Sequence, residues 1–317
     1  MRYRRTILSA VLIASCAFAL AATTSAGAAT RPSVSTGGAH SVSYSSATLG
    51  GTVNPDGADT SYYFQYWTLR VSSPEQSIIA DAGAGTKPVN VKTSVAGLKP
   101  LTLYHYRLVA VNSAGIATGA THSFMTTRVP LSLQILASPN PVLFGGTVVV
   151  QGTLSGTNNA NRTVILQANS FPFTAGFQNV GNPELTTATG SFSFPVLGLG
   201  VATEFRVVTT TNPVIASPIA GVNVAVKVSS HVGRTHRRHF ARIYGTVSPA
   251  EDGAEVGILK IVHGRGVLVA GTKLRHRNAT SSSFSRVVHV SRGAYRVLVR
   301  VTNGAQVSSY GVPLVIG

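Results

Sequence analysis

The sequence has a single cysteine, Cys16, and only nine Asp and Glu residues among 317. One cysteine cannot form a disulfide within the chain, so a stable fold has to come from apolar burial. The scarcity of carboxylates leaves few candidates for the facing pair that a glycosidase uses. The G-x-S-x-G and H-E-x-x-H patterns and a phosphate-binding glycine loop are also missing from the sequence. We therefore expect no enzyme activity, no catalytic residues and no cofactor.

Charged residues are scarce as well, at 11%, whereas the chain has 32 glycines and 15 prolines. No amphipathic helical pattern of useful length follows residue 30. Frequent glycine and proline with few charges are typical of many short strands joined by tight turns. The composition predicts an all-β protein.

The longest apolar run lies at the N-terminus. Residues 2–5 carry three arginines, residues 7–22 are almost wholly apolar, and residues 26–28 are small. This order is typical of an export signal, and the run is shorter than the ~20 residues of a membrane-spanning helix. We predict a signal peptide over residues 1–28 and a protein that is secreted or held at the cell-envelope surface. Lipid anchoring at Cys16 is the alternative.

An internal repeat extends over the remaining sequence. Three similar segments each contain a Gly-Thr pair: Leu49–Val53, Val150–Leu154 and Ile243–Val247. The first and second pairs are 101 residues apart, and the third follows 93 residues later. An aromatic-Arg-apolar step comes later in each unit, at Tyr106–Leu108, Phe205–Val207 and Tyr295–Val297. A period near 100 residues indicates an array of whole domains, because solenoid repeats are shorter.

The stretch from Gly97 to Gly115 places Tyr104, Tyr106 and Leu108 at alternate positions, the period of a strand with one buried face. It resembles the late strands of a fibronectin type III module. The resemblance implies that Tyr104 is the structural tyrosine corner, packed near Leu98 with its hydroxyl bonded to the backbone a few residues upstream. The first unit lacks the tryptophan that is usual on the second strand of the family, where Val53 and Asn54 stand, and it resembles more closely the bacterial variants with a Gly-Thr-Val-Asn-Pro strand. It has no Arg-Gly-Asp sequence.

The second and third units resemble bacterial immunoglobulin-like modules. The sequence thus predicts tandem antiparallel β-sandwiches in an exported bacterial protein, one fibronectin type III-like and two immunoglobulin-like. The expected domains are residues 29–128, 129–228 and 229–317. Residues 126–130 and 228–233 are expected to be the linkers between them.

The net charge of +17 is concentrated in the third unit, where residues 228–317 hold thirteen basic and three acidic residues. Two clusters are candidate polyanion-binding residues: Arg234, Arg237 and Arg238, and then Lys273, Arg275 and Arg277. A cationic surface outside the cell would attract anionic envelope polymers or polysaccharide. Export argues against nucleic acid as the physiological partner. The alternative is that these side chains only solubilise the domain and protect sheet edges.

Six of the nine histidines also fall in the third unit, and His236 and His239 are close in sequence. Zinc sites use three or four ligands, and these two histidines stand among arginines without cysteines. We expect no metal site here.

Aromatic residues are dense between Tyr62 and Trp67. If Tyr62, Phe64 and Tyr66 face the core, then Tyr63 and Trp67 face outward, where they could contact carbohydrate or a protein partner. The alternative is that neighbouring strands cover these two side chains.

The sequence leaves three candidate functions. The first is a non-catalytic binding and spacer protein of the envelope, the second a carbohydrate-binding surface module, and the third an accessory partner of a secreted hydrolase. Other surface proteins are further candidate partners, and the identity of the ligand does not follow from the sequence.

Overall fold

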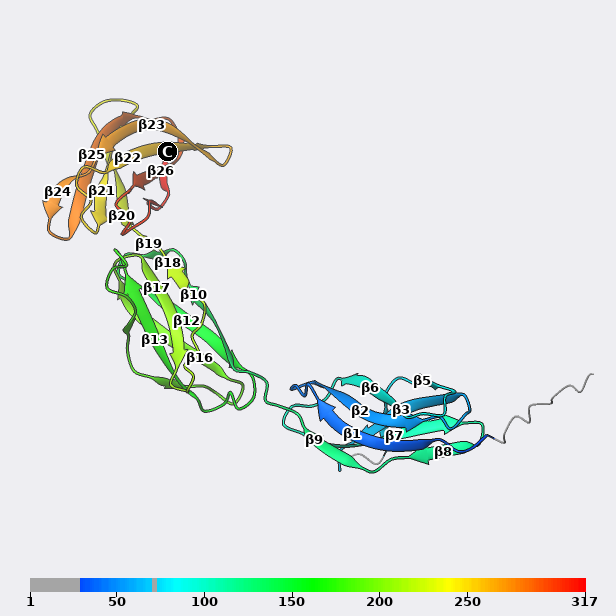
Figure 1. Ribbon diagram of the computed structural model, residues 1–317. Coiled ribbons are helices and arrows are strands. Elements are labelled where there is room, and N and C mark those ends of the chain that lie inside the picture. The colour runs from blue at the N-terminus through cyan, green and yellow to red at the C-terminus, as the bar shows by residue number, and fades with distance from the viewer. Residues whose placement is uncertain (1–28, 70–72) are drawn as a thin grey trace, which may run out of the picture. The chain divides into compact units, whose positions relative to one another are not determined.

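The computed structural model describes residues 29–69 and 73–317 (Figure 1). The expected signal peptide over residues 1–28 and the Cys16 alternative lie outside the described residues. The described backbone forms strands and turns without a helix, so the prediction of an all-β fold is confirmed. Accordingly, these residues include no helix that could cross a membrane. The chain divides into two compact units, one ending at Thr127 and one starting at Arg128.

The first unit is a sandwich of two antiparallel sheets (Figure 1). One sheet has the order β1 (Ser33–His40), β2 (Ser46–Asn54) and β6 (Val89–Ala96). The other has the order β4 (Glu75–Gln76), β3 (Thr60–Trp67), β7 (Leu103–Asn112) and β8 (Gly115–Thr118). Two short strands complete it, β5 (Ala80–Gly83) beside β3 and β9 (His122–Met125) beside β7.

The core of this sandwich follows from the alternation of side chains along its strands. On β3, Tyr62, Phe64 and Tyr66 are buried, as predicted. They pack against residues such as Leu49 and Leu108, which are fully buried on the facing and neighbouring strands. Burying aromatic rings from one sheet against aliphatic side chains from the other holds the two layers together without a disulfide.

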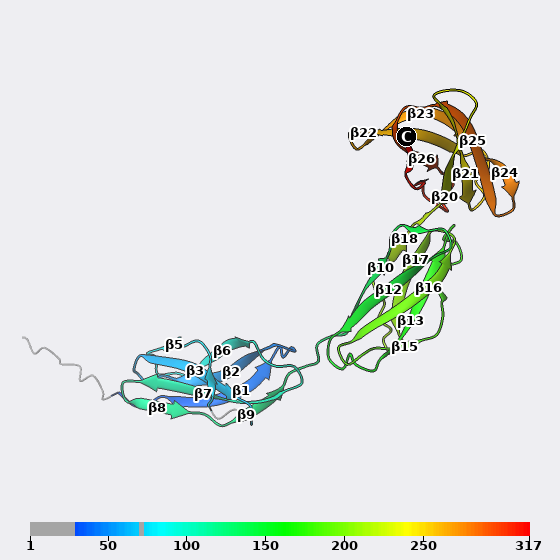
Figure 2. The ribbon, with the colours of Figure 1, turned by 180° about the vertical axis from the view of Figure 1, so that it is seen from behind.

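The second unit begins with another sandwich (Figure 2). One sheet has the order β10 (Ser132–Ser138), β12 (Gly146–Ser155) and β16 (Ser191–Leu199). The other has the order β14 (Gln178–Asn179), β13 (Thr163–Ser170), β17 (Thr203–Thr209) and β18 (Ala220–Val222), with β15 (Glu184–Leu185) also paired to β13. A parallel pair, β11 (Val142–Leu143) and β19 (Val224–Ala225), departs from the antiparallel pairing.

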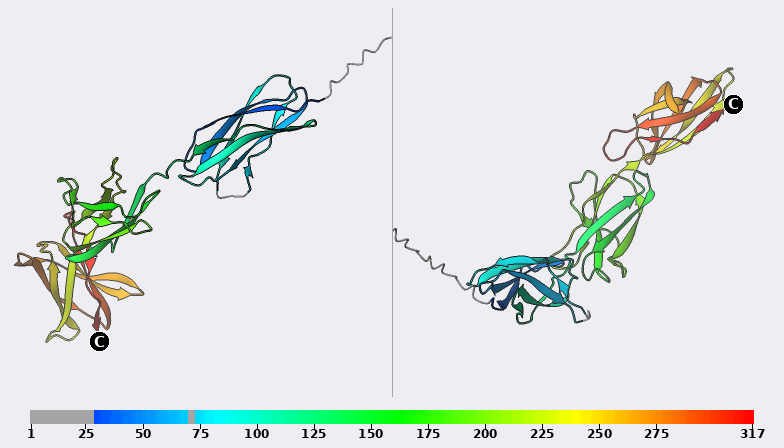
Figure 3. Two further views of the ribbon diagram at one scale, coloured as in Figure 1. Left: turned by 90° about the horizontal axis from the view of Figure 1, so that it is seen from below. Right: turned by 90° about the vertical axis from the view of Figure 1, so that its right-hand side faces the viewer.

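The third sandwich, coloured from yellow to red, is seen from two further sides in Figure 3. One sheet has the order β20 (Lys227–Arg234), β21 (Phe240–Ser248), β25 (Ser281–His289) and β24 (Arg275–Asn278). The other has the order β23 (Arg265–Lys273), β22 (Glu255–Val262), β26 (Gly293–Arg300) and β27 (Ser309–Tyr310), with β28 (Leu314–Ile316) beside β26.

One expectation about the boundaries is wrong. Residues 228–233, expected as a linker, lie inside β20, which pairs with β21 over its whole length. The expected boundary between residues 228 and 229 therefore falls within a strand. The core of the third sandwich already includes Val226, just before β20 begins.

Backbone hydrogen bonds join the second and third sandwiches directly. The Ala202 N–H donates to the Ala305 carbonyl at 2.7 Å, and the Val307 N–H donates to the Val224 carbonyl at 2.7 Å. The side chain of Gln306, which is buried, donates from Nε2 to the Gly200 carbonyl at 2.9 Å. Buried backbone groups paired in this way make the joint an ordered contact instead of a free linker.

The sequence repeat corresponds to equivalent strands of the three sandwiches. The Gly-Thr pairs lie on β2, β12 and β21, and the aromatic-Arg-apolar steps lie on β7, β17 and β26. At Gly51 a Cβ would come within 2.7 Å of both the Ser35 carbonyl oxygen and Leu108 Cδ2. Glycine at this position thus lets the neighbouring strand and a core side chain approach closely.

Candidate functional site

The outer face of the sheet β20-β21-β25-β24 carries several basic side chains. Along β21 the side chains alternate, with Ala241, Ile243 and Val247 buried and Arg242 and Tyr244 exposed. The strand register places His231 and Ser285 on either side of Tyr244, in one row across three strands. In another row, Ser283 of β25 separates Thr246 from Arg275.

A groove of about 750 Å³ lies on this face. Its lining comes from all four strands of the sheet and from the end of β23, and includes His231, Arg242, Tyr244, Lys273, Arg275, Arg277, Ser283 and Ser285. Four of these side chains are cationic at neutral pH, and three carry a hydroxyl, Tyr244, Ser283 and Ser285. We call this surface the basic groove.

Packing holds the centre of the basic groove in place. Arg242 donates from Nε to Ser285 Oγ at 2.8 Å, and its Cζ lies 5.1 Å from the centre of the Tyr244 ring. The His231 ring is 5.6 Å from the Tyr244 ring. The tyrosine ring also lies next to Gly233, where a Cβ would be in ordinary van der Waals contact, 3.4 Å from Tyr244 Cε1. A glycine next to an aromatic ring that covers it is a recurring way to stabilise an outer strand.

The structure separates the two predicted basic clusters. Lys273, Arg275 and Arg277 line the basic groove. The other cluster lies at the far end of the same sheet, where Arg234 ends β20 and Arg237 and Arg238 fall in the turn before β21. Along β21, the row that contains Arg234 and the row that contains Arg275 are five residues apart, which corresponds to about 17 Å along a strand. Arg237 lies over the Phe240 ring, with Cζ 5.5 Å from its centre.

Sequence reasoning did not single out Arg242 and Tyr244. Their signal was present, because polar and apolar residues alternate along Phe240–Ser248 and so place Arg242 and Tyr244 on one face. The proximity of His231 to Tyr244 depends on how β20 and β21 pair, which the alternation alone does not give.

The three carboxylates of the third sandwich are engaged elsewhere. Asp252 is 2.8 Å from His276 Nδ1 and also accepts a hydrogen bond from Ser282. These two partners hold the pKa of Asp252 below its usual value, with the Ser282 hydroxyl contributing most. Glu251 accepts two bonds from Asn303 Nδ2, at 3.0 and 3.1 Å. Burial nevertheless raises the pKa of Glu251.

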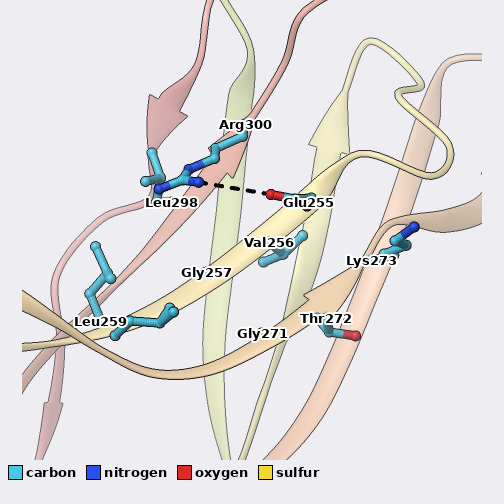
Figure 4. Close-up of a pocket in the computed structure, with 10 residues that line it drawn as sticks. Glu255, Val256, Gly257, Leu259, Gly271, Thr272, Lys273, Leu298 and Arg300 are labelled. Atoms are coloured by element: carbon cyan, nitrogen blue, oxygen red, sulfur yellow. Dashed lines mark ion pairs between the residues drawn. The ribbon is translucent and has the colours of Figure 1, made fainter.

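The remaining carboxylate, Glu255, lies 3.9 Å from Arg300 (Figure 4). Over residues 29–69 and 73–317, the ion pairs are the His276–Asp252 and Arg300–Glu255 contacts. The arginines of the basic groove are therefore not neutralised by a carboxylate of the described chain, and their charge is available to an external anion.

Figure 4 shows a second hollow, of about 380 Å³, on the other sheet of this sandwich. Leu259, Leu268 and Leu298 form much of its lining, and the Glu255–Arg300 pair lies at one side. Because its one carboxylate is paired and the remainder is largely apolar, we assign it no chemistry. Lys273 lines both hollows, at the end of β23.

The predicted aromatic contact residues Tyr63 and Trp67 are half-buried on the outer face of β3. Trp67 stacks on His105, with ring centres 6.1 Å apart, and Arg107 lies over it at 5.6 Å. Arg107 in turn donates from Nε to Gln65 Oε1 at 2.8 Å. Neighbouring side chains of β3 and β7 thus cover part of the tryptophan that could otherwise contact a ligand.

The same arrangement recurs in the other sandwiches. The arginine of each aromatic-Arg-apolar step lies over an aromatic ring: Arg107 over Trp67, Arg206 over Phe177 at 4.2 Å, and Arg296 over Tyr310 at 5.0 Å. Arg206 also repeats the bond to glutamine, donating from Nε to Gln167 Oε1 at 2.8 Å. A cation over a ring at these distances stabilises the outer face of a sheet, which is a structural role for the repeated arginine.

Tyr104 and Leu98 are both buried, and the Lys99 N–H donates to the Tyr104 hydroxyl at 3.0 Å. This is the hydrogen bond that a tyrosine corner requires. A comparable contact occurs in the third sandwich, where the Tyr295 hydroxyl accepts from the Ser291 N–H and donates to the Ser291 carbonyl, both at 3.0 Å.

Among the described residues, no group of three or more His, Cys, Asp or Glu side chains is placed to hold a metal ion. The His239 ring lies near the His289 ring, with ring centres 6.3 Å apart, and His236 lies in the same turn as Arg237.

No family model and no characterised protein matches this chain. Solved structures do. Domains A168–A170 from titin match with 16% identity and a TM-score of 0.38, covering 90% of this chain and 98% of that one. The FN1–FN3 domains of chicken CNTN1 match with 13% identity and a TM-score of 0.29, covering 90% and 96%. A tetra-tandem repeat in the extending region of a large adhesion protein matches with 16% identity and a TM-score of 0.30, covering 90% and 74%.

These neighbours are runs of consecutive domains or repeats, and they are similar to this chain in fold alone. The strands and sheets described above give the fold directly. The chain is an all-β protein built of tandem antiparallel β-sandwiches.

Proposed function

We propose that this chain is a non-catalytic binding and spacer protein, secreted or associated with the cell envelope, whose third sandwich contacts anionic envelope polymers. The basic groove carries the proposal. It gathers Arg242, Arg275, Arg277 and Lys273 on one face, and no carboxylate of the described chain pairs with them. A row of unneutralised cations attracts a polyanion by releasing its counterions.

The joint between the second and third sandwiches supports the spacer part. Its backbone bonds, at Ala202 and Val307, hold two consecutive domains in contact. A binding sandwich attached in this way transmits its position to the domain before it, instead of swinging on a flexible tether.

The test is co-sedimentation of residues 29–317 with purified cell envelope over a salt series. Three groove arginines are reversed together, Arg242→Glu, Arg275→Glu and Arg277→Glu. The matched control reverses three exposed arginines of the same sandwich that do not line the groove, Arg265→Glu, Arg286→Glu and Arg292→Glu. Both variants carry the same net charge, so a difference between them reports position and not total charge.

We expect the unchanged chain to pellet at low salt and its affinity to fall by about tenfold or more toward moderate salt. The groove variant should lose binding, and the control variant should keep most of it. Retention that does not depend on salt, or equal losses in the two variants, would argue against the groove. If the unchanged chain does not bind the envelope at any salt concentration, the proposed function is wrong.

A further inference from the structure

The centre of the basic groove contains groups that a simple polyanion does not need. Tyr244 is 37% exposed and stands between His231 and Arg242. The hydroxyls of Ser283 and Ser285 lie on the adjacent strand. Cations alone suffice to hold a chain of phosphates. An exposed aromatic ring and neutral hydroxyls suit a ligand that also has apolar ring faces and hydroxyls of its own.

The geometry points to an acidic polysaccharide, one whose sugar rings carry carboxylates, as the ligand of the basic groove. This inference rests on the proposed function and names its ligand class. A sugar ring would pack on the exposed part of Tyr244. The ring carboxylates would be bound by Arg242 and by Arg275, whose row in the strand register is two residues beyond that of Tyr244 and four beyond that of Arg242.

Arg242 is positioned for this role before any ligand arrives. Its Nε donates to Ser285 Oγ, which fixes the plane of the guanidinium beside the tyrosine. A guanidinium has five N–H donors, so the bond to Ser285 leaves four for a carboxylate. An arginine held in one geometry loses little side-chain freedom on binding.

Tyr244 is held in the same way. The ring packs at Gly233, where a Cβ would be 3.4 Å from Cε1, and the His231 ring is 5.6 Å away. A ring supported by its own sheet provides a rigid contact surface for a ligand. Tyr310 gives a matched comparison on the other sheet, because it is 51% exposed and lies under Arg296 in the same manner, but does not line the groove.

The experiment measures binding of residues 29–317 to three soluble probes at low salt: oligogalacturonate, polyphosphate of similar total charge, and single-stranded DNA. The variants are Tyr244→Leu, which removes the ring, and Tyr244→Phe, which keeps it. Tyr310→Leu is the matched control. Thermal unfolding of each variant checks that the third sandwich is intact.

We expect Tyr244→Leu to weaken oligogalacturonate binding by roughly three- to tenfold, the range of an aromatic contact, and to leave polyphosphate binding unchanged. Tyr244→Phe and Tyr310→Leu should both bind like the unchanged chain. Should Tyr244→Leu fail to fold, saturation transfer between the Tyr244 ring and the sugar C–H protons in the unchanged chain provides the same information.

Equal effects of Tyr244→Leu on oligogalacturonate and polyphosphate, or none on either, would overturn the inference while leaving electrostatic binding in place. Tighter binding of single-stranded DNA than of oligogalacturonate would also overturn it, since bases stack on aromatic rings too. The absence of saturation transfer would do the same. If none of the three polyanions binds, the proposed function fails together with the inference.

Discussion

Gly245 of β21 lies directly against the carbonyl oxygen of Ser229 on β20, and a Cβ at Gly245 would overlap that oxygen. It would also come within 2.8 Å of the Phe284 ring, which belongs to the core. Gly152 has the same relationship to the Gln134 carbonyl and to the Phe192 ring in the second sandwich. In both sandwiches the repeated glycine thus leaves the space that the repeated phenylalanine ring occupies.

Gly245→Ala should therefore destabilise the third sandwich, because the added methyl group forces either the strand or the phenylalanine to move. Overpacking of this kind costs about 1–3 kcal/mol. Gly271→Ala is the control on the same sandwich, since the nearest atom to its Cβ would be the Val256 carbonyl oxygen at 3.9 Å. Chemical unfolding followed by near-ultraviolet circular dichroism would compare the two. Equal stability would show that the repeated glycine is not required for packing.

Tyr104→Phe removes the hydroxyl that accepts the Lys99 N–H and leaves that backbone donor without its partner. The expected loss is about 1 kcal/mol, the net value of one such hydrogen bond. Amide hydrogen exchange at Lys99 should become several-fold faster. Tyr63→Phe is the control, because Tyr63 is half-buried on the opposite face of β3. Unchanged exchange at Lys99 in Tyr104→Phe would contradict the role of the tyrosine corner.

Much of this architecture could be predicted from alternation. Tyr62, Phe64 and Tyr66 were placed in the core because every second residue of a strand faces the same side, and they are buried. The beginning of the third sandwich could not be placed in the same way. Residues 228–233 contain serines, a histidine and a glycine, which are typical of a linker. In an outer strand half of the residues face solvent, so its composition is close to that of a loop.

The candidate site was predictable only in part, because it depends on which strands are neighbours. Composition showed the charge of the third unit and identified Arg275 and Arg277 as candidates. It could not show that β24 lies beside β25, or that Arg234 is at the far end of the same sheet. The contact of Tyr244 with His231 requires the register of β20 and β21, which is set by pairing between residues distant in sequence.

Tyr66 gives a prediction about alkaline pH. Burial, reinforced by the Glu75 carboxylate on the neighbouring strand, raises the pKa of Tyr66 to about 12 from the ordinary value of 10.0. The raised pKa means that folding favours the protonated form of this tyrosine. Its contribution to stability is therefore fully present at any pH below the pKa that the tyrosine has in the unfolded chain. That stability is lost as the pH rises from 10 through about 12.

Absorbance titration of the tyrosinates should show a late step near pH 12 that becomes smaller in Tyr66→Phe. Burial also raises the pKa of Tyr106, so late ionisation of that tyrosine remains in the variant. The same variant should show a smaller loss of stability between pH 10 and pH 12 than the unchanged chain. Complete ionisation of all tyrosines near pH 10 in the folded protein would contradict the prediction. Glu75→Gln tests the smaller contribution, and should move the late step to lower pH while leaving most of the shift in place.

The joint between the second and third sandwiches gives the last prediction. Gln306 connects the two, because it donates to the Gly200 carbonyl and accepts from Asn303 Nδ2 at 2.9 Å within its own loop. Gln306→Ala leaves both partners without this buried side chain, at a cost of about 1–3 kcal/mol. Since the lost hydrogen bonds belong to the contact between the two domains, the joint should open more easily without unfolding of either core.

The measurement is amide hydrogen exchange. Exchange at Ala202 and Val307 should rise by tenfold or more, as expected for about 1.4 kcal/mol, while exchange at the buried amides of β21 stays unchanged. Thr302→Ala, an exposed change in the same loop, should leave both amides protected. Equal protection in Gln306→Ala and Thr302→Ala would mean that the backbone bonds alone hold the joint, and that the third sandwich keeps its position without the glutamine.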